Sequence, residues 1–392
     1  MSVTVSAWSR RYALISAFAL VCWQVGIVFE VPRRTEIALG LFGFVFHMVF
    51  GKAYALVPSY FDSELAFPWA PKTQFPLVVV GTAGLVVSSL GIETGWLTAG
   101  SAALWFLGVA VFVGTLVSTI GRALIRGETG TGEHNAERLP VDRLANGFVP
   151  VALSYLLVGS YEIAALYGPL PALFGGAPAQ ASHLLAAGTA AVLVFALGFR
   201  LLPRFLVVSP PLWVVRIVLP AAAAGPVLIA AGLEIPRLQI VGAALEAVAV
   251  CLFAAALARM FVRSDRRRVG LYGVLAGAGS GVGGVLLGLV FAFDGTTAPL
   301  TTLHFRLNVL GFLGLTVVGL AYQFYPPSVG EFPGSSERTA ALSILGICAG
   351  LLTHAISLRI GLDALTTVGY LPAFGGSVLY AYLLVSAFFT RM

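Results

Sequence analysis

Apolar runs of about 20 residues recur along the whole chain, and they restrict its fold more than any other feature. An α-helix of that length crosses the hydrocarbon core of a bilayer and satisfies its backbone hydrogen bonds within the segment. Only 10% of the 392 residues are charged, whereas a soluble domain has about a quarter. The sequence therefore predicts an all-α integral membrane protein of about twelve transmembrane helices, and it excludes a soluble enzyme.

Proline, glycine and charged residues separate the expected spans, because these residues end helices. The spans are expected at residues 11–29, 36–57, 74–92, 96–120, 146–167, 182–202, 211–231, 236–262, 269–293, 301–324, 338–359 and 366–389. Between the fourth and fifth spans, residues 121–145 are Gly-rich and mixed in charge, which predicts a long mobile loop.

Basic residues are distributed unevenly between the two sets of helix ends. Sixteen lie at the ends on the side of the N-terminus, and five lie at the opposite ends. Because basic loops stay in the cytoplasm, we expect both termini to be cytoplasmic and the chain to be a multi-pass protein of the plasma (cytoplasmic) membrane. The net charge of +6 comes from these helix ends, so the expected partner is the lipid bilayer and no nucleic acid.

The second, sixth and tenth expected spans share a pattern. Each begins with a polar residue that is followed fifteen positions later by a glycine: Glu36 and Gly51, His183 and Gly198, His304 and Gly319. Residues at that spacing lie within about 60° of each other on a helix, so they share a face. The pattern predicts three pseudo-repeated four-helix blocks at 1–144, 145–268 and 269–392, together forming one membrane domain. For the glycines alone, close helix packing is the alternative explanation.

The polar heads of these three spans are the candidate functional residues, because an ionisable side chain is costly inside a membrane. Imidazole ligates haem iron, copper, iron or zinc, and two histidines with one carboxylate form the ligand set of a facial triad. We therefore expect His304 and His183 to bind a cofactor, either haem b or a single iron or copper ion. His183, His304 and Glu36 are the expected metal ligands. The alternative interpretation is that all three are polar residues that lie at the membrane interface, at the starts of their helices, and bind no cofactor.

A second glycine pattern lies in the ninth expected span. Residues 279–284 match G-x-G-x-x-G, but no strand precedes them, which excludes a dinucleotide site. Gly273, Gly277, Gly281, Gly284 and Gly288 are instead expected to form a seam for helix packing.

The stretch from His304 to Gly314, continuing to Gly319, Tyr322 and Pro326, resembles helix 10 of the catalytic subunit of haem–copper oxidases. That helix carries a haem-ligating His-x-His followed by spaced glycines. The twelve spans in three blocks are similar to the same subunit, and to the NnrS-type haem and copper membrane proteins of nitrogen-oxide metabolism. The resemblance implies that helices 2, 6 and 10 are the inner helices, with metals towards the outer face.

Some ligand positions of that family hold other residues in this chain. Thr302 replaces the first histidine of helix 10, Glu36 replaces the haem ligand of helix 2, and the seventh span has no histidine. The resemblance thus implies a haem ligand in His304 and a position near the first copper ligand for His183, without a complete oxygen-reducing centre.

Together these features predict a haem- or metal-binding membrane protein in electron transfer or nitrogen-oxide handling. If the protein is an enzyme, it is a membrane oxidoreductase whose catalytic residues the sequence does not identify. A further expected partner is a respiratory or electron-transfer protein that docks at the outer face of the membrane. A metal-free transporter, or a scaffold or assembly subunit on the same fold, is the alternative.

Overall fold

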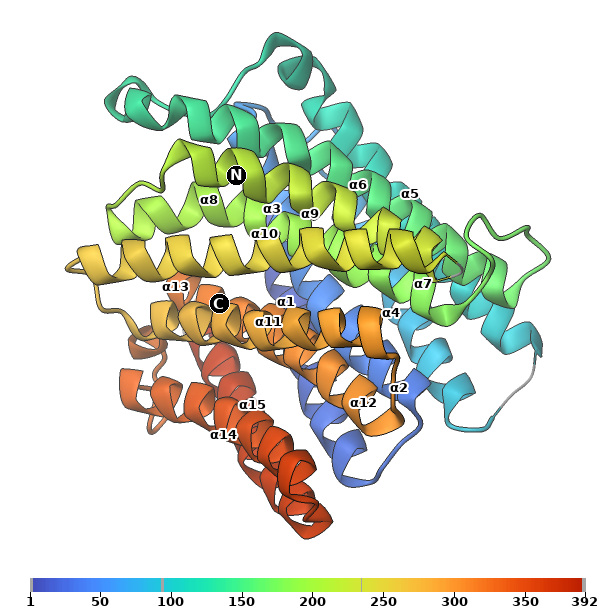
Figure 1. The fold of residues 1–392 in the computed structure, drawn as a ribbon. Helices are drawn as coiled ribbons and strands as arrows, with labels where there is room; N and C mark the ends of the chain where they lie inside the picture. Colours follow the sequence, from blue (N-terminus) through green and yellow to red (C-terminus); the bar gives the residue numbers. More distant parts are fainter. Residues whose placement is uncertain (1–2, 93–94, 234, 390–392) are drawn as a thin grey trace. The chain divides into compact units, whose positions relative to one another are not determined.

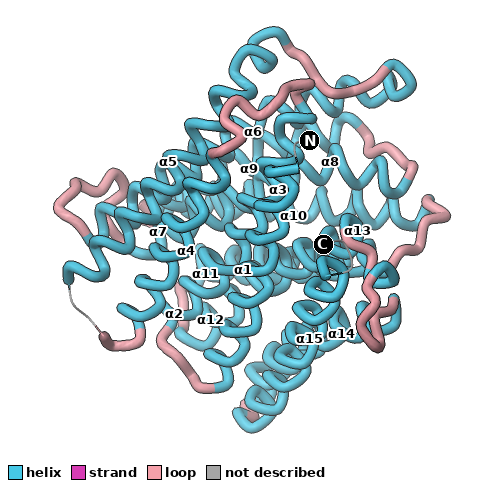
Figure 2. The backbone as a smooth tube through the Cα atoms, turned by 180° about the vertical axis from the view of Figure 1, so that it is seen from behind, coloured by secondary structure: helices cyan, strands magenta, loops and turns pink. Residues whose placement is uncertain are grey.

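The computed structural model describes residues 3–92, 95–233 and 235–389, and all regular structure within these ranges is helical (Figures 1 and 2). Twelve of the helices are long and apolar enough to cross a membrane. Each coincides with one of the spans predicted from the sequence, which confirms a twelve-span, all-α multi-pass membrane protein.

The elements follow one another along the chain as α1 (Val3–Val28), α2 (Arg33–Ile37), η1 (Ala38–Phe46), α3 (His47–Tyr60), α4 (Ala70–Ser89), α5 (Gly95–Arg126), η2 (Glu133–Arg138), α6 (Leu139–Tyr167), α7 (Pro178–His183), η3 (Leu184–Ala191), α8 (Val192–Leu206), α9 (Leu212–Gly232), α10 (Pro236–Arg263), α11 (Val269–Asp294), α12 (Ala298–Arg306), η4 (Leu307–Leu315), α13 (Thr316–Phe324), η5 (Pro327–Val329), α14 (Glu337–Ile360) and α15 (Asp363–Phe389). Three spans are composite: α2–η1–α3 form the second, α7–η3–α8 the sixth and α12–η4–α13 the tenth.

The chain divides into two compact units. Unit 1 comprises Met1–Tyr12 and Phe46–Arg263, and unit 2 comprises Ala13–Val45 and Ser264–Met392. The first and second spans therefore contribute to both units. The three four-helix blocks expected from the sequence remain a prediction.

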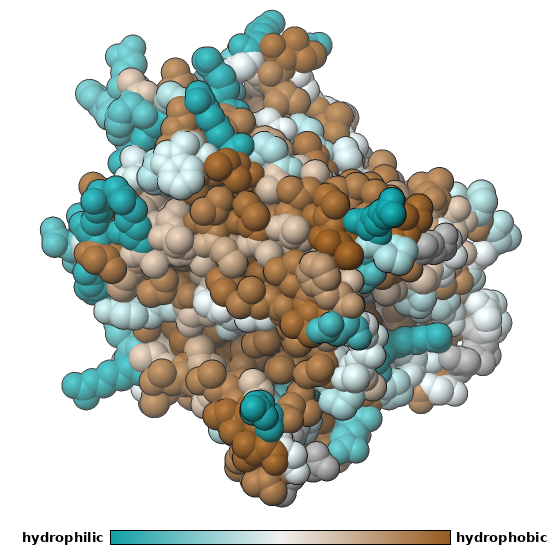
Figure 3. Space-filling model, in the orientation of Figure 1, coloured by the Kyte–Doolittle hydropathy of each residue, from teal (hydrophilic) through white to brown (hydrophobic). Residues whose placement is uncertain are grey.

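Neighbouring antiparallel helices make the main contacts within each unit. In unit 1, α4 packs against α5 and α9 against α10, while α6 contacts both α5 and α8. In unit 2, α11 packs along η4 and α13, and α14 forms a hairpin with α15 (Figure 1). The space-filling view shows apolar residues over the middle of α10 and polar residues towards its ends (Figure 3), as a lipid-facing helix requires.

The predicted glycine seam of α11 is confirmed. A Cβ at Gly277 would lie 3.1 Å from the Phe312 carbonyl oxygen, and one at Gly281 would lie 2.9 Å from the Phe312 ring. Gly273 faces Gly319 in the same way, and Gly284 and Gly288 face Asn308 and His304. The five glycines thus allow α11 to approach the tenth span closely, as small residues do in membrane helix pairs.

Alanine at Gly319 is expected to destabilise the protein by about 1–3 kcal/mol, because its Cβ would overlap the backbone of α11. The added atom would lie 2.8 Å from the Val274 amide nitrogen and even closer to the Gly270 carbonyl oxygen. Gly279 in α11 is the matched control: a Cβ there meets nothing within 4 Å. Gly279→Ala is expected to be neutral or to stabilise by about 0.5–1 kcal/mol. Unfolding in detergent compares the two variants, and equal effects would contradict this packing.

The second, sixth and tenth spans differ from the other nine in their helix geometry. Each contains a π-helical segment of eight or nine residues: η1, η3 and η4. π-Helices are rare and are usually single turns at functional sites. The same three spans are also the most buried, with 78%, 78% and 72% of an apolar 18-residue stretch inside the protein, against 28–56% for the others. Burial of this kind is what irregular backbone requires inside a membrane.

The glycines fifteen residues after the polar heads all face neighbouring helices. A Cβ at Gly51 would lie 2.7 Å from Tyr12 Cβ, and one at Gly198 would lie 3.1 Å from the Phe253 ring. With Gly319 against α11, all three positions serve close packing, which is the explanation that needs no cofactor.

Candidate functional site

His304 lies in the last turn of α12, and η4 begins three residues later. Its Nδ1 atom is 3.0 Å from the carbonyl oxygen of Gly284 in α11. Because a carbonyl oxygen only accepts hydrogen bonds, Nδ1 donates in this contact, and Nε2 then carries the lone pair of the neutral ring. The Asn308 side-chain nitrogen lies 3.4 Å from Nε2. Metal-ligating histidines are held in this way, with the second nitrogen bonded to a carbonyl or carboxylate.

Contacts with α11 and with the next turn fix the orientation of His304. A Cβ at Gly288 would lie 3.2 Å from the His304 Cε1 atom, and the Phe291 ring centroid is 5.4 Å from that of the imidazole. Asn308, one turn later, donates through Nδ2 to the His304 carbonyl oxygen at 2.8 Å. The imidazole is therefore positioned by the seam rather than by a single hydrogen bond.

His183 has the corresponding position in the sixth span, as the last residue of α7 before η3. Its Nδ1 atom is 2.8 Å from the carbonyl oxygen of Ala179, one turn earlier in the same helix. By the same reasoning the neutral ring carries its lone pair on Nε2. Both expected ligands thus precede a π-helix and have Nδ1 engaged by backbone.

Glu36 occupies the equivalent turn of the second span, in α2 before η1, but its carboxylate is part of an ion-pair network. Arg306 approaches it through two contacts of 3.3 Å, from Nε to Oε2 and from Nη2 to Oε1. The indole Nε1 of Trp23 donates to Oε2 at 3.2 Å, and Arg33 Nη1 is 3.7 Å from Oε1. We refer to Trp23, Arg33, Glu36 and Arg306 as the Glu36 cluster.

The cluster links α1, α2 and α12 within unit 2. Arg33 donates to the Thr301 carbonyl oxygen at 2.8 Å and lies over the Phe305 ring at 4.2 Å. The Phe305 ring packs edge-on against Trp23, with centroids 5.6 Å apart. Two arginines and one carboxylate leave one positive charge in excess, next to the backbone turn that carries His304.

His354 of α14 is also near these charges. It is buried, and it interacts electrostatically with Arg306, Glu36 and Arg33. Among the described residues, no hydrogen-bond partner reaches its Nδ1 atom. The charged groups of unit 2 therefore lie near a second histidine of that unit, one that the sequence pattern did not associate with Glu36.

Unit 1 contains a second buried charge network, at the ends of α3, α6 and α8. Arg204 contacts Asp142 at 2.6 and 3.2 Å, and Arg200 Nε is 3.7 Å from Asp142 Oδ1. Arg200 Nη1 also donates to the Tyr60 carbonyl oxygen at 2.9 Å and to the Asn146 side chain. These five residues form the Asp142 cluster, in which Asp142 and Arg200 are 1% and 2% exposed.

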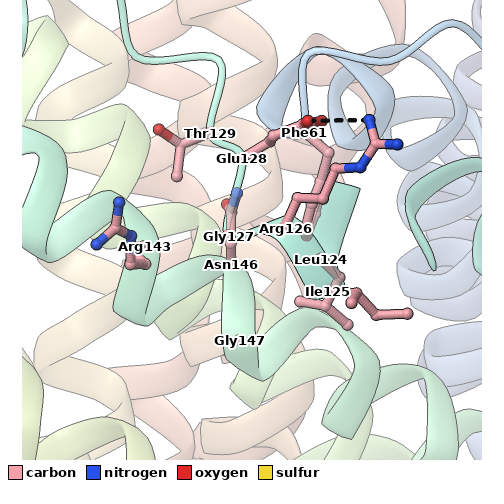
Figure 4. A pocket seen from close by; sticks show the side chains of 10 residues that line it. All are labelled: Phe61, Leu124, Ile125, Arg126, Gly127, Glu128, Thr129, Arg143, Asn146 and Gly147. Carbon is pink, nitrogen blue, oxygen red and sulfur yellow. Dashed lines mark ion pairs between the residues drawn. The ribbon is translucent and has the colours of Figure 1, made fainter. Parts of the chain in front are cut away.

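A pocket of about 450 Å³ lies beside the Asp142 cluster. Asn146 borders it, and the end of α5 and the start of α6 form its walls (Figure 4). Arg126 and Glu128, 3.6 Å apart, lie on one side, and Arg143 lies on the other (Figure 4). The pocket is therefore polar and of mixed charge.

Sequence reasoning found the polar heads of the three spans but missed the partners of Glu36. Arg33 and Arg306 were counted only as charges at helix ends. Their signal was that a buried carboxylate requires a cation. Arg33 lies three residues before Glu36, and Arg306 lies two residues after His304. Asp142 was missed because residues 121–145 were expected to be a loop. That expectation was wrong at both ends of the segment, since α5 extends to Arg126 and α6 begins at Leu139, with residues 127–132 and the short helix η2 between them.

Within residues 3–92, 95–233 and 235–389, no group of three or more His, Cys, Asp or Glu side chains lies together in a way that could hold a metal ion. The expected metal site of His183, His304 and Glu36 thus has no support from the described residues. An axial haem ligand is a different case, because the porphyrin supplies the other four donors. No protein-family model matches the chain, and neither does any curated protein.

Proposed function

We propose that this multi-pass membrane protein binds haem, with Nε2 of His304 in unit 2 and Nε2 of His183 in unit 1 each serving as an axial ligand within its own unit, and that it acts in electron transfer or nitrogen-oxide handling. The observation that carries the proposal is the way these two imidazoles are held. Each has Nδ1 against a backbone carbonyl oxygen, as histidine ligands of metals do. Each also stands just before a π-helix in a deeply buried span.

The residues present fit a haem ligand set better than a facial triad. The carboxylate of Glu36 is occupied by Arg306 and Trp23, so its proposed role is to hold Arg306 beside the tenth span. A haem held by an imidazole would supply a one-electron redox centre whose potential depends on axial ligands and burial. An iron or copper ion held at either imidazole is the second cofactor to be tested.

An optical spectrum of the purified protein tests the proposal. We expect a Soret band, with sharper bands after reduction, and elemental analysis that shows iron in proportion to protein. His134 in η2 is exposed, so His134→Ala serves as the control and should leave the spectrum unchanged. Folded protein, expressed with excess haem, that contains neither chromophore nor stoichiometric iron or copper would contradict the proposal.

One observation favours a transporter as the second candidate. Charged side chains are buried within spans of both units, in the Glu36 and Asp142 clusters, and such residues often mark ion or proton pathways. Ion flux into proteoliposomes by a sample that contains no haem or metal would support transport and exclude the redox proposal.

A further inference from the structure

One of the buried glutamates of unit 1, Glu246, belongs to neither charge cluster. Glu246 lies in α10 and is 6% exposed, at the interface with α9. A Cβ at Gly225 would lie 2.6 Å from its Oε1 atom and 2.8 Å from its Cγ atom. One turn earlier, a Cβ at Gly242 would lie 2.9 Å from the Gly225 carbonyl oxygen. The absence of a side chain at Gly225 thus provides the space that the carboxyl group occupies.

Within the part of the chain that the structure describes, no cation pairs with this carboxyl group. Its Oε1 atom is buried without a hydrogen-bond partner, and no ion pair connects Glu246 to another described residue. Tyr155 of α6 is the titratable group with which it interacts electrostatically, but the Tyr155 hydroxyl donates to the Ala223 carbonyl oxygen at 2.5 Å. Arg216, the only charged residue of α9, is nine residues from Gly225, which is about 13 Å along a helix.

The facing turn of α9 offers acceptors rather than donors. Pro226 follows Gly225 directly and has no N–H, so the carbonyl of Ala222 lacks the donor that a regular helix would provide. An ionised carboxylate facing such a surface would be unpaired in a medium that does not solvate charge. The neutral acid can instead donate its O–H to an acceptor, so the surroundings favour the protonated form.

We propose that Glu246 is a proton-binding site inside the membrane, distinct from the proposed haem ligands and from both charge clusters. The reaction is reversible: the carboxylate binds one proton to give the neutral acid and releases it again. The site is poorly suited to a metal cation, because a cation requires several oxygen donors and this part of the interface supplies one carboxyl group. The site lies between α9 and α10, so it is independent of the proposed function.

A hydrophobic carbodiimide tests the site, because it reacts with protonated carboxyl groups inside membranes. The carboxyl oxygen adds to the central carbon, the acid proton moves to a carbodiimide nitrogen, and the adduct rearranges to a stable acylurea without a leaving group. The intact protein in lipid is labelled over a range of pH and digested for mass spectrometry. Infrared spectra of wild type and Glu246→Gln report the carbonyl stretch of a protonated acid.

We expect the peptide that contains Glu246 to be labelled at neutral pH and Glu246→Gln to lose that label. The labelling rate should fall about tenfold per pH unit once the group ionises. Glu162 is the matched control: it is also buried, but its Oε1 atom accepts a hydrogen bond from the Leu173 amide at 2.7 Å. Its peptide should stay unlabelled.

Gly225→Ala provides a second variant, because its Cβ would displace the carboxyl group without removing it. It should alter the protonated-acid band in the infrared spectrum even if Glu246→Gln does not fold. An unlabelled Glu246 peptide at every pH, or a wild-type spectrum without a protonated-acid band that these variants change, would overturn the proposal. Protection from labelling by sodium ions, but not by high pH, would overturn it as well.

Discussion

Replacing Asp142 with alanine is expected to lower the free energy of unfolding by about 3–5 kcal/mol, because the change leaves buried arginine unpaired. Asp142 is the carboxylate that both Arg204 and Arg200 contact, at 2.6 and 3.7 Å. Without it, Arg200 keeps only neutral partners at a site where it is 2% exposed. Denaturant unfolding in mild detergent, followed by tryptophan fluorescence, measures the loss.

Glu137 provides the matched control for this prediction. It pairs with Arg138 at 3.2 Å, but its side chain is 60% exposed. Exposed ion pairs contribute about 0–1 kcal/mol, so Glu137→Ala should change stability by a few tenths. Similar losses in Asp142→Ala and Glu137→Ala would show that the Asp142 cluster is not a buried network.

Replacing Glu36 with alanine is the second change with a large expected effect, again about 3–5 kcal/mol. Arg306 is 7% exposed, and after the change it would lie beside Arg33 with no carboxylate between them. The second and tenth spans would then repel each other at the turns that precede η1 and η4. The same unfolding measurement reports the effect.

A double variant separates the loss of the pair from the cost of an isolated charge. Replacing both partners of a buried ion pair with apolar residues is often neutral or stabilising. Glu36→Leu combined with Arg306→Leu should therefore recover most of the stability that Glu36→Leu alone removes. A double variant whose loss equals the sum of the two single losses would contradict a direct pairing of Glu36 with Arg306.

The positions of the spans could be predicted from the sequence because the thickness of the bilayer fixes how long an apolar run must be. The helix ends were less predictable. Residues 139–145 were assigned to a loop although α6 begins at Leu139, since the first turns of that helix contain Asp142 and Arg143. Such turns lie outside the apolar run and carry no hydropathy signal, but their backbone is still helical.

The glycine seam of α11 was predictable for a different reason. Its glycines recur at the spacing of a helix face, and no strand precedes them, so packing was the physical explanation that remained. Gly281 against Phe312 confirms it. By contrast, η1, η3 and η4 have ordinary alanine-, leucine- and glycine-rich sequences. No local sequence motif indicates their π-helical geometry, which we attribute to tertiary packing.

The candidate site was predictable in its residue types but not in its pairing. His183, His304 and Glu36 stood out because charged or imidazole groups are rare in apolar spans. The partners of Glu36 did not, since Arg33 and Arg306 occur where basic residues normally flank a span. Only the structure distinguishes a basic residue that faces the headgroups from one buried 3.3 Å from a carboxylate.

The most direct test of the account is the spectrum of a His304→Gly variant before and after addition of free imidazole. If Nε2 of His304 ligates haem iron, the variant should lose or shift the Soret band, and imidazole bound in the space left by the side chain should restore it. A variant with the same spectrum as wild type, with or without imidazole, would contradict a ligand role for His304.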